Sequence, residues 1–158
     1  ENRDGQFRVA YLFGKGRGTP KNDERAVYWY QKAADQGNKY AMLNLGIRFQ
    51  AGRGVKKSWK KAAHWYEMAV NAGSLKAMSG LGYMFKHGRG GKPKDVAKAL
   101  SLFRRAAEKG DASGRYNLGL MYQLGKGLPQ NISNAALWYR RAADQNLAAA
   151  QGCHLGPQ

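Results

Sequence analysis

The fold is decided by a stretch whose first part, residues 41–54, reads Ala-Met-Leu-Asn-Leu-Gly-Ile-Arg-Phe-Gln-Ala-Gly-Arg-Gly. After a basic connector, residues 62–73 read Ala-Ala-His-Trp-Tyr-Glu-Met-Ala-Val-Asn-Ala-Gly. The pattern occurs four times, and each copy keeps a large ring, a Gly-x-Gly pair and a second bulky pair at matched spacing. The four sets are Phe13, Gly16, Gly18, Trp29 and Tyr30; Phe49, Gly52, Gly54, Trp65 and Tyr66; Phe85, Gly88, Gly90, Leu102 and Phe103; and Tyr122, Gly125, Gly127, Trp138 and Tyr139. Self-similarity at a fixed period predicts a repeat array.

Each copy predicts two helices joined by a loop. Ala41, Leu45 and Phe49 recur at i, i+4 and i+8, which places them on one helical face. The Gly-x-Gly pair supplies the left-handed backbone that ends the first helix. We expect the second helices to begin after the capping residues Asn22, Ser58, Asp95 and Asn131 and to end at Gly37, Gly73, Gly110 and Asn146.

These signals divide the chain into repeat units. The predicted units are residues 5–40, 41–76, 77–113 and 114–149, within a single repeat domain of residues 1–158. Residues 150–158 begin a further unit that never reaches its Gly-x-Gly pair. We therefore expect a short capping helix or a frayed end from Leu147 onward.

Glycines inside the first helices predict close packing. Gly46, Gly82 and Gly119 occupy equivalent positions, and a glycine within a helix costs roughly 1 kcal/mol relative to alanine. Their recurrence predicts that a second helix approaches too closely for a side chain, and Ala10 at the matching place in the first unit agrees. We expect each aromatic pair to fill the space above such small residues, with each buried Trp contributing on the order of 1.5–3 kcal/mol.

Composition bounds the partners. The chain carries 27 Lys and Arg against 10 Asp and Glu, a formal net charge of +17, and 43% of its residues are hydrophobic. Such a charge favours an acidic protein, a nucleic acid or an anionic membrane surface as partner. No run of 18 apolar residues exists, which predicts no membrane-spanning helix. The sequence starts at Glu1 without a methionine, and we find no signal peptide in it.

The residue types that carry catalysis or metals show no matching pattern. His64, His87 and His154 lack metal-ligand spacing, and Cys153 is the lone cysteine, so no disulfide can form within the chain. Residues 14–18, Gly-Lys-Gly-Arg-Gly, lack the Gly-Lys-Ser/Thr ending of a phosphate loop. The sequence therefore predicts no catalytic residue, no metal site and no cofactor.

The repeated residues resemble the Sel-1-like repeat family: Ala-x3-Leu-Gly-x2-Tyr/Phe-x2-Gly-x-Gly, a capping residue, then Ala-x2-Trp-Tyr-x2-Ala-Ala and Gly. The resemblance covers roughly residues 5–146, with departures at Val9-Ala10, at Leu102-Phe103 and in the one-residue longer third loop. It implies an all-α, right-handed superhelical solenoid of about four tetratricopeptide-like units. It also implies a non-enzymatic scaffold or adaptor in a bacterial periplasm or cytoplasm.

The resemblance also implies where a partner binds, because the first helices of tetratricopeptide-like arrays line the concave face. The predicted concave-face residues are Tyr11, Tyr40, Leu43, Ile47, Gln50, Tyr83, Lys86, Tyr116, Leu120 and Gln123. Loop cations of successive units should line one edge of the array. The predicted basic edge comprises Arg17, Arg53, Lys56, Lys57, Arg89 and Lys92.

Three interpretations of the function stay open at this point. The leading one is a scaffold for a partner protein with an acidic surface, such as a toxin or effector, an envelope protein or a signalling protein. A toxin-neutralising immunity protein is a special case of it. A basic solenoid that binds nucleic acid is the third, because cations and tyrosines offer phosphate contacts and base stacking. No recognised nucleic-acid motif accompanies them.

Overall fold

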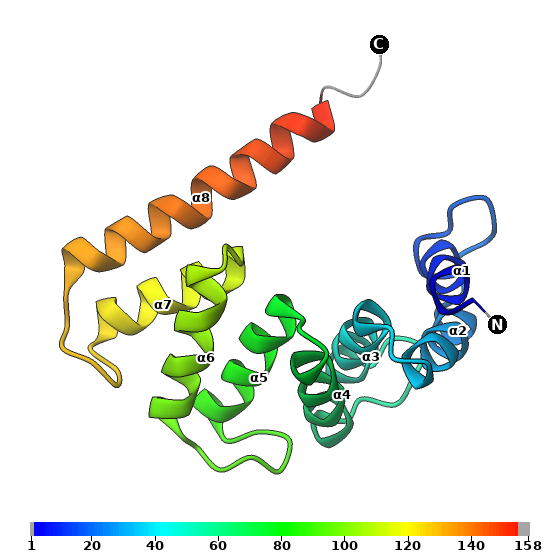
Figure 1. Cartoon of the computed structure of the whole chain (residues 1–158), viewed down its shortest axis with the longest axis horizontal. Helices are drawn as coiled ribbons and strands as arrows, with labels where there is room; N and C mark the ends of the chain where they lie inside the picture. The colour runs from blue at the N-terminus through cyan, green and yellow to red at the C-terminus, as the bar shows by residue number, and fades with distance from the viewer. Residues whose placement is uncertain (1, 155–158) are drawn as a thin grey trace.

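The protein is an array of paired helices. The computed structural model describes the backbone of residues 2–154 and the side chains of residues 2–145, and these residues form eight α-helices and no strand. The pairs are α1 (Arg3–Lys15) with α2 (Asp23–Asp35), α3 (Lys39–Ala51) with α4 (Trp59–Asn71), α5 (Leu75–His87) with α6 (Val96–Glu108), and α7 (Ala112–Leu124) with α8 (Ile132–His154). The pairs follow one another along a curved path (Figure 1). The predicted all-α repeat fold is confirmed.

The predicted helix starts are confirmed in all four units. The side chain of Asn22 accepts a hydrogen bond from the Arg25 backbone N–H at 2.9 Å, and Ser58, Asp95 and Asn131 act in the same way. The backbone N–H of each capping residue also donates to a carbonyl near the end of the preceding first helix. The four carbonyls belong to Phe13, Phe49, Phe85 and Tyr122, at 2.9–3.0 Å. Each loop is thus closed by one conserved pattern of backbone bonding.

Glycines end the first helices as expected. Gly16, Gly52, Gly88 and Gly125 are left-handed C-caps with φ between 61° and 70°. Among the second helices, α2, α4 and α6 each end two residues before a glycine with positive φ. The predicted ends near Gly37, Gly73 and Gly110 are therefore confirmed.

The predicted end of α8 at Asn146 is wrong, because this helix continues to His154. Asn146 stands where the other units have a glycine, and Leu147 stands where Asn38, Ser74 and Asp111 cap the next helix. With both stop signals missing, residues 147–154 extend α8 instead of forming a separate capping helix or a frayed end. Residues 155–158 lie outside the described part of the chain. None of the described helices is both long and apolar enough to cross a bilayer.

In the second, third and fourth units, the core pairs a ring on the second helix with a glycine on the first helix. A Cβ on Gly46 would lie 2.6 Å from the Tyr66 ring, and one on Gly82 would lie 2.7 Å from the Phe103 ring. Tyr66 is 3% exposed and Phe103 is fully buried. The expected role of the tryptophans is corrected here, since Trp29, Trp65 and Trp138 are only half-buried. In these three units the second residue of each bulky pair fills the core, because its ring faces the glycine directly.

Successive units meet through the second glycine of each Gly-x-Gly pair. A Cβ on Gly90 would lie 2.6 Å from the Trp59 carbonyl oxygen, and one on Gly54 would overlap the Asp23 carbonyl. A Cβ on Gly127 would lie 3.1 Å from a side-chain carbon of Val96, so this contact is with a side chain and is less tight. These contacts place the loop of each unit on the start of the preceding second helix. Of the first helices, α5 and α7 also contact each other directly.

Candidate functional site

The candidate site is the solvent-facing side of the first helices, which we call the groove face. Five large side chains mark it: Tyr11, Tyr40, Ile47, Tyr83 and Tyr116. Tyr40 and Tyr116 are each 55% exposed and Ile47 is 43% exposed, whereas Tyr11 and Tyr83 are half-buried. Tyr40 and Ile47 are seven residues apart on α3, so they project from the same side of that helix.

A hollow of about 650 Å³ opens between α1 and α3. It brings together three predicted residues, Tyr11, Arg17 and Tyr40, with Phe7 and Leu12 as its further apolar lining. The Phe7 ring lies 6.0 Å from the Tyr40 ring, centroid to centroid. Asp4 and Arg8 also line the hollow, so it can receive an apolar side chain beside two cations and one carboxylate.

A smaller hollow of about 240 Å³ follows, lined by Tyr11, Ile47 and Arg53 among others. Beneath it, Arg48 is 9% exposed and donates a 2.8 Å hydrogen bond to Asp23. This bond, together with the guanidinium charge, holds the pKa of the Asp23 carboxyl below its usual value.

Sequence reasoning missed this role of Arg48. The guanidinium of Arg48 lies over the Tyr30 ring and occupies the space where a side chain at position 14 would be. The signal was Gly14, which stands where α3 and α7 carry glutamine.

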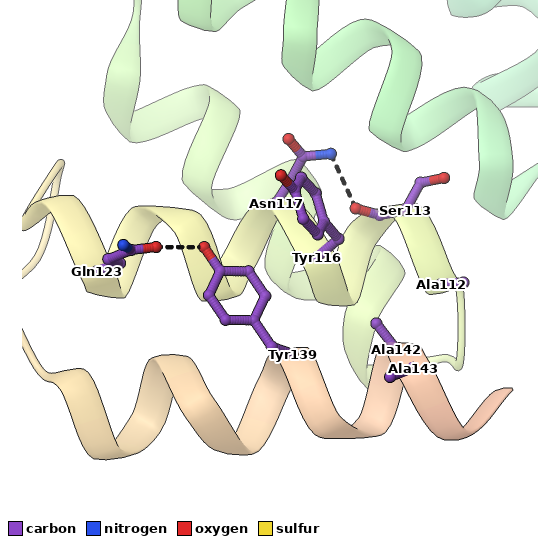
Figure 2. A pocket seen from close by; sticks show the side chains of 8 residues that line it. All are labelled: Ala112, Ser113, Tyr116, Asn117, Gln123, Tyr139, Ala142 and Ala143. Carbon is purple, nitrogen blue, oxygen red and sulfur yellow. Dashed lines mark hydrogen bonds between the residues drawn. The ribbon is translucent and has the colours of Figure 1, made fainter. Parts of the chain in front are cut away.

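The third hollow, of about 740 Å³, lies between α7 and α8 (Figure 2). Tyr116 and Gln123 line it, as does Tyr139, whose hydroxyl donates to the Gln123 side-chain oxygen at 2.7 Å. Desolvation raises the pKa of the Tyr139 hydroxyl. The Tyr116 ring lies 5.4 Å from the Tyr139 ring, so the hollow has aromatic walls and a polar end.

The predicted concave-face residues near the ends of the first helices, Gln50, Lys86 and Gln123, divide into two kinds. Gln50 accepts a 2.6 Å hydrogen bond from the Tyr66 hydroxyl, as Gln123 does from Tyr139, so both glutamines hold a ring within their own unit. In the third unit the glutamine is replaced by Lys86 and the tyrosine by Phe103, which has no hydroxyl. Lys86 is half-buried, and burial, with the nearby Lys126 ammonium, lowers its pKa.

Two predicted concave-face residues contribute little surface. Leu43 is 8% exposed and belongs to the core, so its prediction as a partner-binding residue is corrected. Its counterpart in the last unit, Tyr116, is 55% exposed. Leu120 is half-buried and corresponds to Ile47 on α3.

An aromatic cluster between the second and third units was only partly predicted. The Tyr83 ring stacks on Trp59 with centroids 6.1 Å apart and lies 4.4 Å from the His87 ring. The Arg89 guanidinium lies 4.5 Å from the Trp59 centroid and 5.5 Å from that of Tyr83. Lys57 approaches the same indole to 5.2 Å. Trp59 was missed because it stands alone among the four units at the first residue of a second helix.

The predicted basic edge is mostly solvent-exposed. Its exposed members are Arg17, Arg53, Lys56, Lys57 and Arg89. Lys92 differs, since it is half-buried and forms an ion pair with Glu67 of α4. No other member of this edge forms an ion pair with a described residue.

No group of three His, Cys, Asp or Glu side chains that could hold a metal ion occurs among the described residues. The His64 ring lies edge-on to Trp65 at 5.3 Å. The side chains of Cys153 and His154 fall outside the described part. Within that part, no buried side-chain nitrogen or oxygen lacks a hydrogen-bond partner.

Comparison with known proteins gives a consistent result. A family model described as Sel1 repeat matches residues 3–38, 39–74, 75–111 and 112–147. The first helix of each predicted unit starts two residues earlier than the predicted boundary, at the residue where each match begins.

Two solved structures and one curated relative show the same similarity. A Sel1 repeat protein from Oxalobacter formigenes is 32% identical with a TM-score of 0.81, over 90% of this chain and 58% of that one. A protective antigen of uropathogenic Escherichia coli strains, displaying an SLR fold, is 34% identical with a TM-score of 0.82, over 91% and 31%. An Arabidopsis thaliana F-box protein is 41% identical over 54 residues, 34% of this chain and 15% of that protein. The chain thus spans less than two thirds of each of these proteins.

Proposed function

This chain belongs to the Sel1 repeat family, and we propose that it is a non-enzymatic scaffold that binds another protein through its groove face. Proteins of this family are generally protein-interaction scaffolds and are typically not enzymes. The observation that carries the proposal is the set of rings and aliphatic side chains on one side of the first helices, which are exposed on α3 and α7 and half-buried on α1 and α5. Aromatic anchors that enter pockets supply much of the energy of protein interfaces.

The hollows suggest how a partner would be held. The hollow at Tyr11 and Tyr40 and the one at Tyr116 and Tyr139 each offer aromatic walls with a polar or cationic rim. An extended segment of the partner that runs along the first helices from α1 to α7 would place side chains in both hollows. Arg17 in the first of these hollows, and Arg53 in the smaller hollow that follows it, favour carboxylates beside these apolar contacts.

We further propose that this partner has an acidic surface. The net charge of +17 and the exposed, unpaired loop cations support this assignment. Complementary charge mainly raises the association rate and sharpens partner choice. We therefore expect the association rate to fall with added salt and the dissociation rate to change little.

Matched pairs of exposed side chains provide the test. Tyr40→Asp and Ile47→Asp change the groove face, whereas Tyr28→Asp and Met68→Asp change the second helices at residues of similar exposure, 55% and 40%. Partner proteins would be captured from nuclease-treated lysate with each variant and quantified by mass spectrometry.

We expect the two groove variants to retain at least about tenfold less of a specific partner than the two controls, as for loss of an interface hot spot. Equal retention by all four variants would contradict the groove assignment. If the wild-type protein retains partners from untreated lysate but not from nuclease-treated lysate, a nucleic-acid partner would be favoured instead.

A further inference from the structure

Cationic side chains gather at the C-terminal end of α5. Lys86 and His87 occupy its last turn, and the following loop closes back on it. The Asp95 backbone N–H donates to the Phe85 carbonyl and the Arg89 N–H to the Met84 carbonyl, both at 2.9 Å. This closure brings Lys94 against Gly88, 3.3 Å from the position of a Cβ there.

A further cation comes from the neighbouring unit. Lys126 lies in the loop after α7, and α7 contacts α5 directly. Burial lowers the pKa of Lys86 and of His87, and the charge of Lys126 lowers both further. We call these five side chains the α5 cation cluster: Lys86, His87, Arg89, Lys94 and Lys126.

No acidic side chain compensates this cluster within the described part of the chain. Asp95 caps α6, and Glu67 pairs with Lys92, which is not a member. None of the five members forms an ion pair with a described residue. In units two and four, the residue at the position of Lys86 is a glutamine that accepts a hydrogen bond from a tyrosine hydroxyl. In the third unit, Phe103 replaces that tyrosine, so Lys86 has no such hydroxyl beside it.

We propose that the α5 cation cluster binds neighbouring carboxylates of an acidic segment in a partner protein. The inference rests on the proposed scaffold function, since it names the chemistry that the third unit recognises. Like charges held close together repel one another, and an anion that enters among them relieves that repulsion. The guanidinium of Arg89 also offers a planar fork of donors that matches a carboxylate.

The aromatic surroundings favour carboxylates over a single-stranded nucleic acid. Base recognition without sequence preference needs open ring faces on which bases can stack. Here the Trp59 ring is approached by Arg89 at 4.5 Å and Lys57 at 5.2 Å, and Tyr83 is packed against Trp59 and His87. The rings therefore position the cations and leave little surface for bases.

The proposal predicts a proton linkage at His87. Burial lowers the pKa of His87, as do the charges of Lys86, Arg89, Lys126 and Lys94. Bound carboxylates would favour the charged imidazole and raise that pKa. Affinity for the acidic segment should accordingly increase as pH falls through the titration of His87.

The test uses a fluorescein-labelled oligoglutamate peptide and an oligothymidylate of equal charge, measured by fluorescence anisotropy at fixed ionic strength. Lys86→Gln/Lys126→Gln removes two cluster charges and installs at position 86 the glutamine that units two and four already carry. Arg104→Gln/Lys109→Gln removes the same charge from exposed positions of α6 and its end.

We expect oligoglutamate to bind about tenfold more weakly to the cluster variant and unchanged to the control. The His87 imidazole signals should titrate at higher pH in the complex, and His87→Gln should remove the pH dependence of affinity. Equal losses in the two double variants, or tighter binding of oligothymidylate that the cluster variant weakens, would overturn the proposal.

The scaffold proposal is separable from this one. Tyr28→Asp should leave oligoglutamate binding unchanged, because Tyr28 lies on α2 outside both the cluster and the groove face. If oligoglutamate does not bind while Tyr40→Asp still loses captured partners, only the cluster assignment fails. If oligoglutamate binds as expected and Tyr40→Asp retains as much captured partner as the wild-type protein, only the groove assignment fails.

Discussion

Replacing Gly82 by alanine tests whether the buried ring sets the distance between the two helices of a unit. On an isolated helix this change stabilises by roughly 1 kcal/mol, because alanine is the better helix former. In the folded protein the new Cβ would lie 2.7 Å from the Phe103 ring, well inside contact distance. Phe103 is fully buried, so its ring has no free space into which to move.

The two effects can be weighed against each other. Overpacking a well-filled core costs typically 1–3 kcal/mol, and a fully enclosed ring places this site toward the upper end. Subtracting the helix gain leaves an expected loss of about 1–2 kcal/mol in the free energy of unfolding. Urea denaturation followed by far-ultraviolet circular dichroism would measure it.

The chain supplies its own control. Gly5 is helical too, but a Cβ there would meet only Asn2 at 3.8 Å, an ordinary contact. Gly5→Ala should therefore stabilise by about 0.5–1 kcal/mol. In a double-mutant cycle, Phe103→Leu should cost less in the Gly82→Ala background than alone, because the smaller side chain relieves the clash. Equal stabilisation by Gly82→Ala and Gly5→Ala would refute the reasoning.

Three further changes follow from the described contacts. Tyr66→Phe removes the donor to Gln50 and should lower the free energy of unfolding by about 1 kcal/mol, measured by urea denaturation; no change would mean that solvent replaces the bond. Gly54→Ala should lower the melting temperature more than Gly18→Ala, since both have φ of 71° but only Gly54 presses on the preceding unit, and equal shifts would count against that contact. Because the pKa of Asp23 is lowered in the folded state, its contribution to the free energy of unfolding is complete above about pH 4 and is lost as the pH falls through the folded-state pKa. Asp23→Asn should therefore make the free energy of unfolding depend less on pH in this acid range. A variant curve parallel to that of the wild type would contradict this.

The residues that begin and end the helices of each repeat made most of the fold predictable from sequence. Helix starts depend on side chains that bond their own backbone, as at Asn22, and helix ends depend on glycines with left-handed backbone, as at Gly52. Both are local effects, so a single sequence reveals them. The error at Asn146 shows the limit, because asparagine tolerates a left-handed cap without requiring one. The missing cap at Leu147 was the stronger signal.

The site was less predictable because it depends on contacts between units. Leu43 and Tyr116 occupy equivalent places in the repeat, yet one is 8% and the other 55% exposed, so the position within a unit does not by itself determine exposure. The buried Arg48 depends on the absence of a side chain at Gly14, far away in the sequence. Such pairings become visible only when the units are stacked.

The glycine contacts between units also have a mechanical consequence. At Gly54 and Gly90 the loop backbone presses on the backbone of the preceding helix, so the angle between neighbours depends on main-chain atoms. Changes of surface side chains can then alter what each hollow binds without altering the pitch of the coil. The backbone would then fix the distance between successive hollows, and so the spacing of the residues that the proposed partner places in them, independently of the chemistry of those residues.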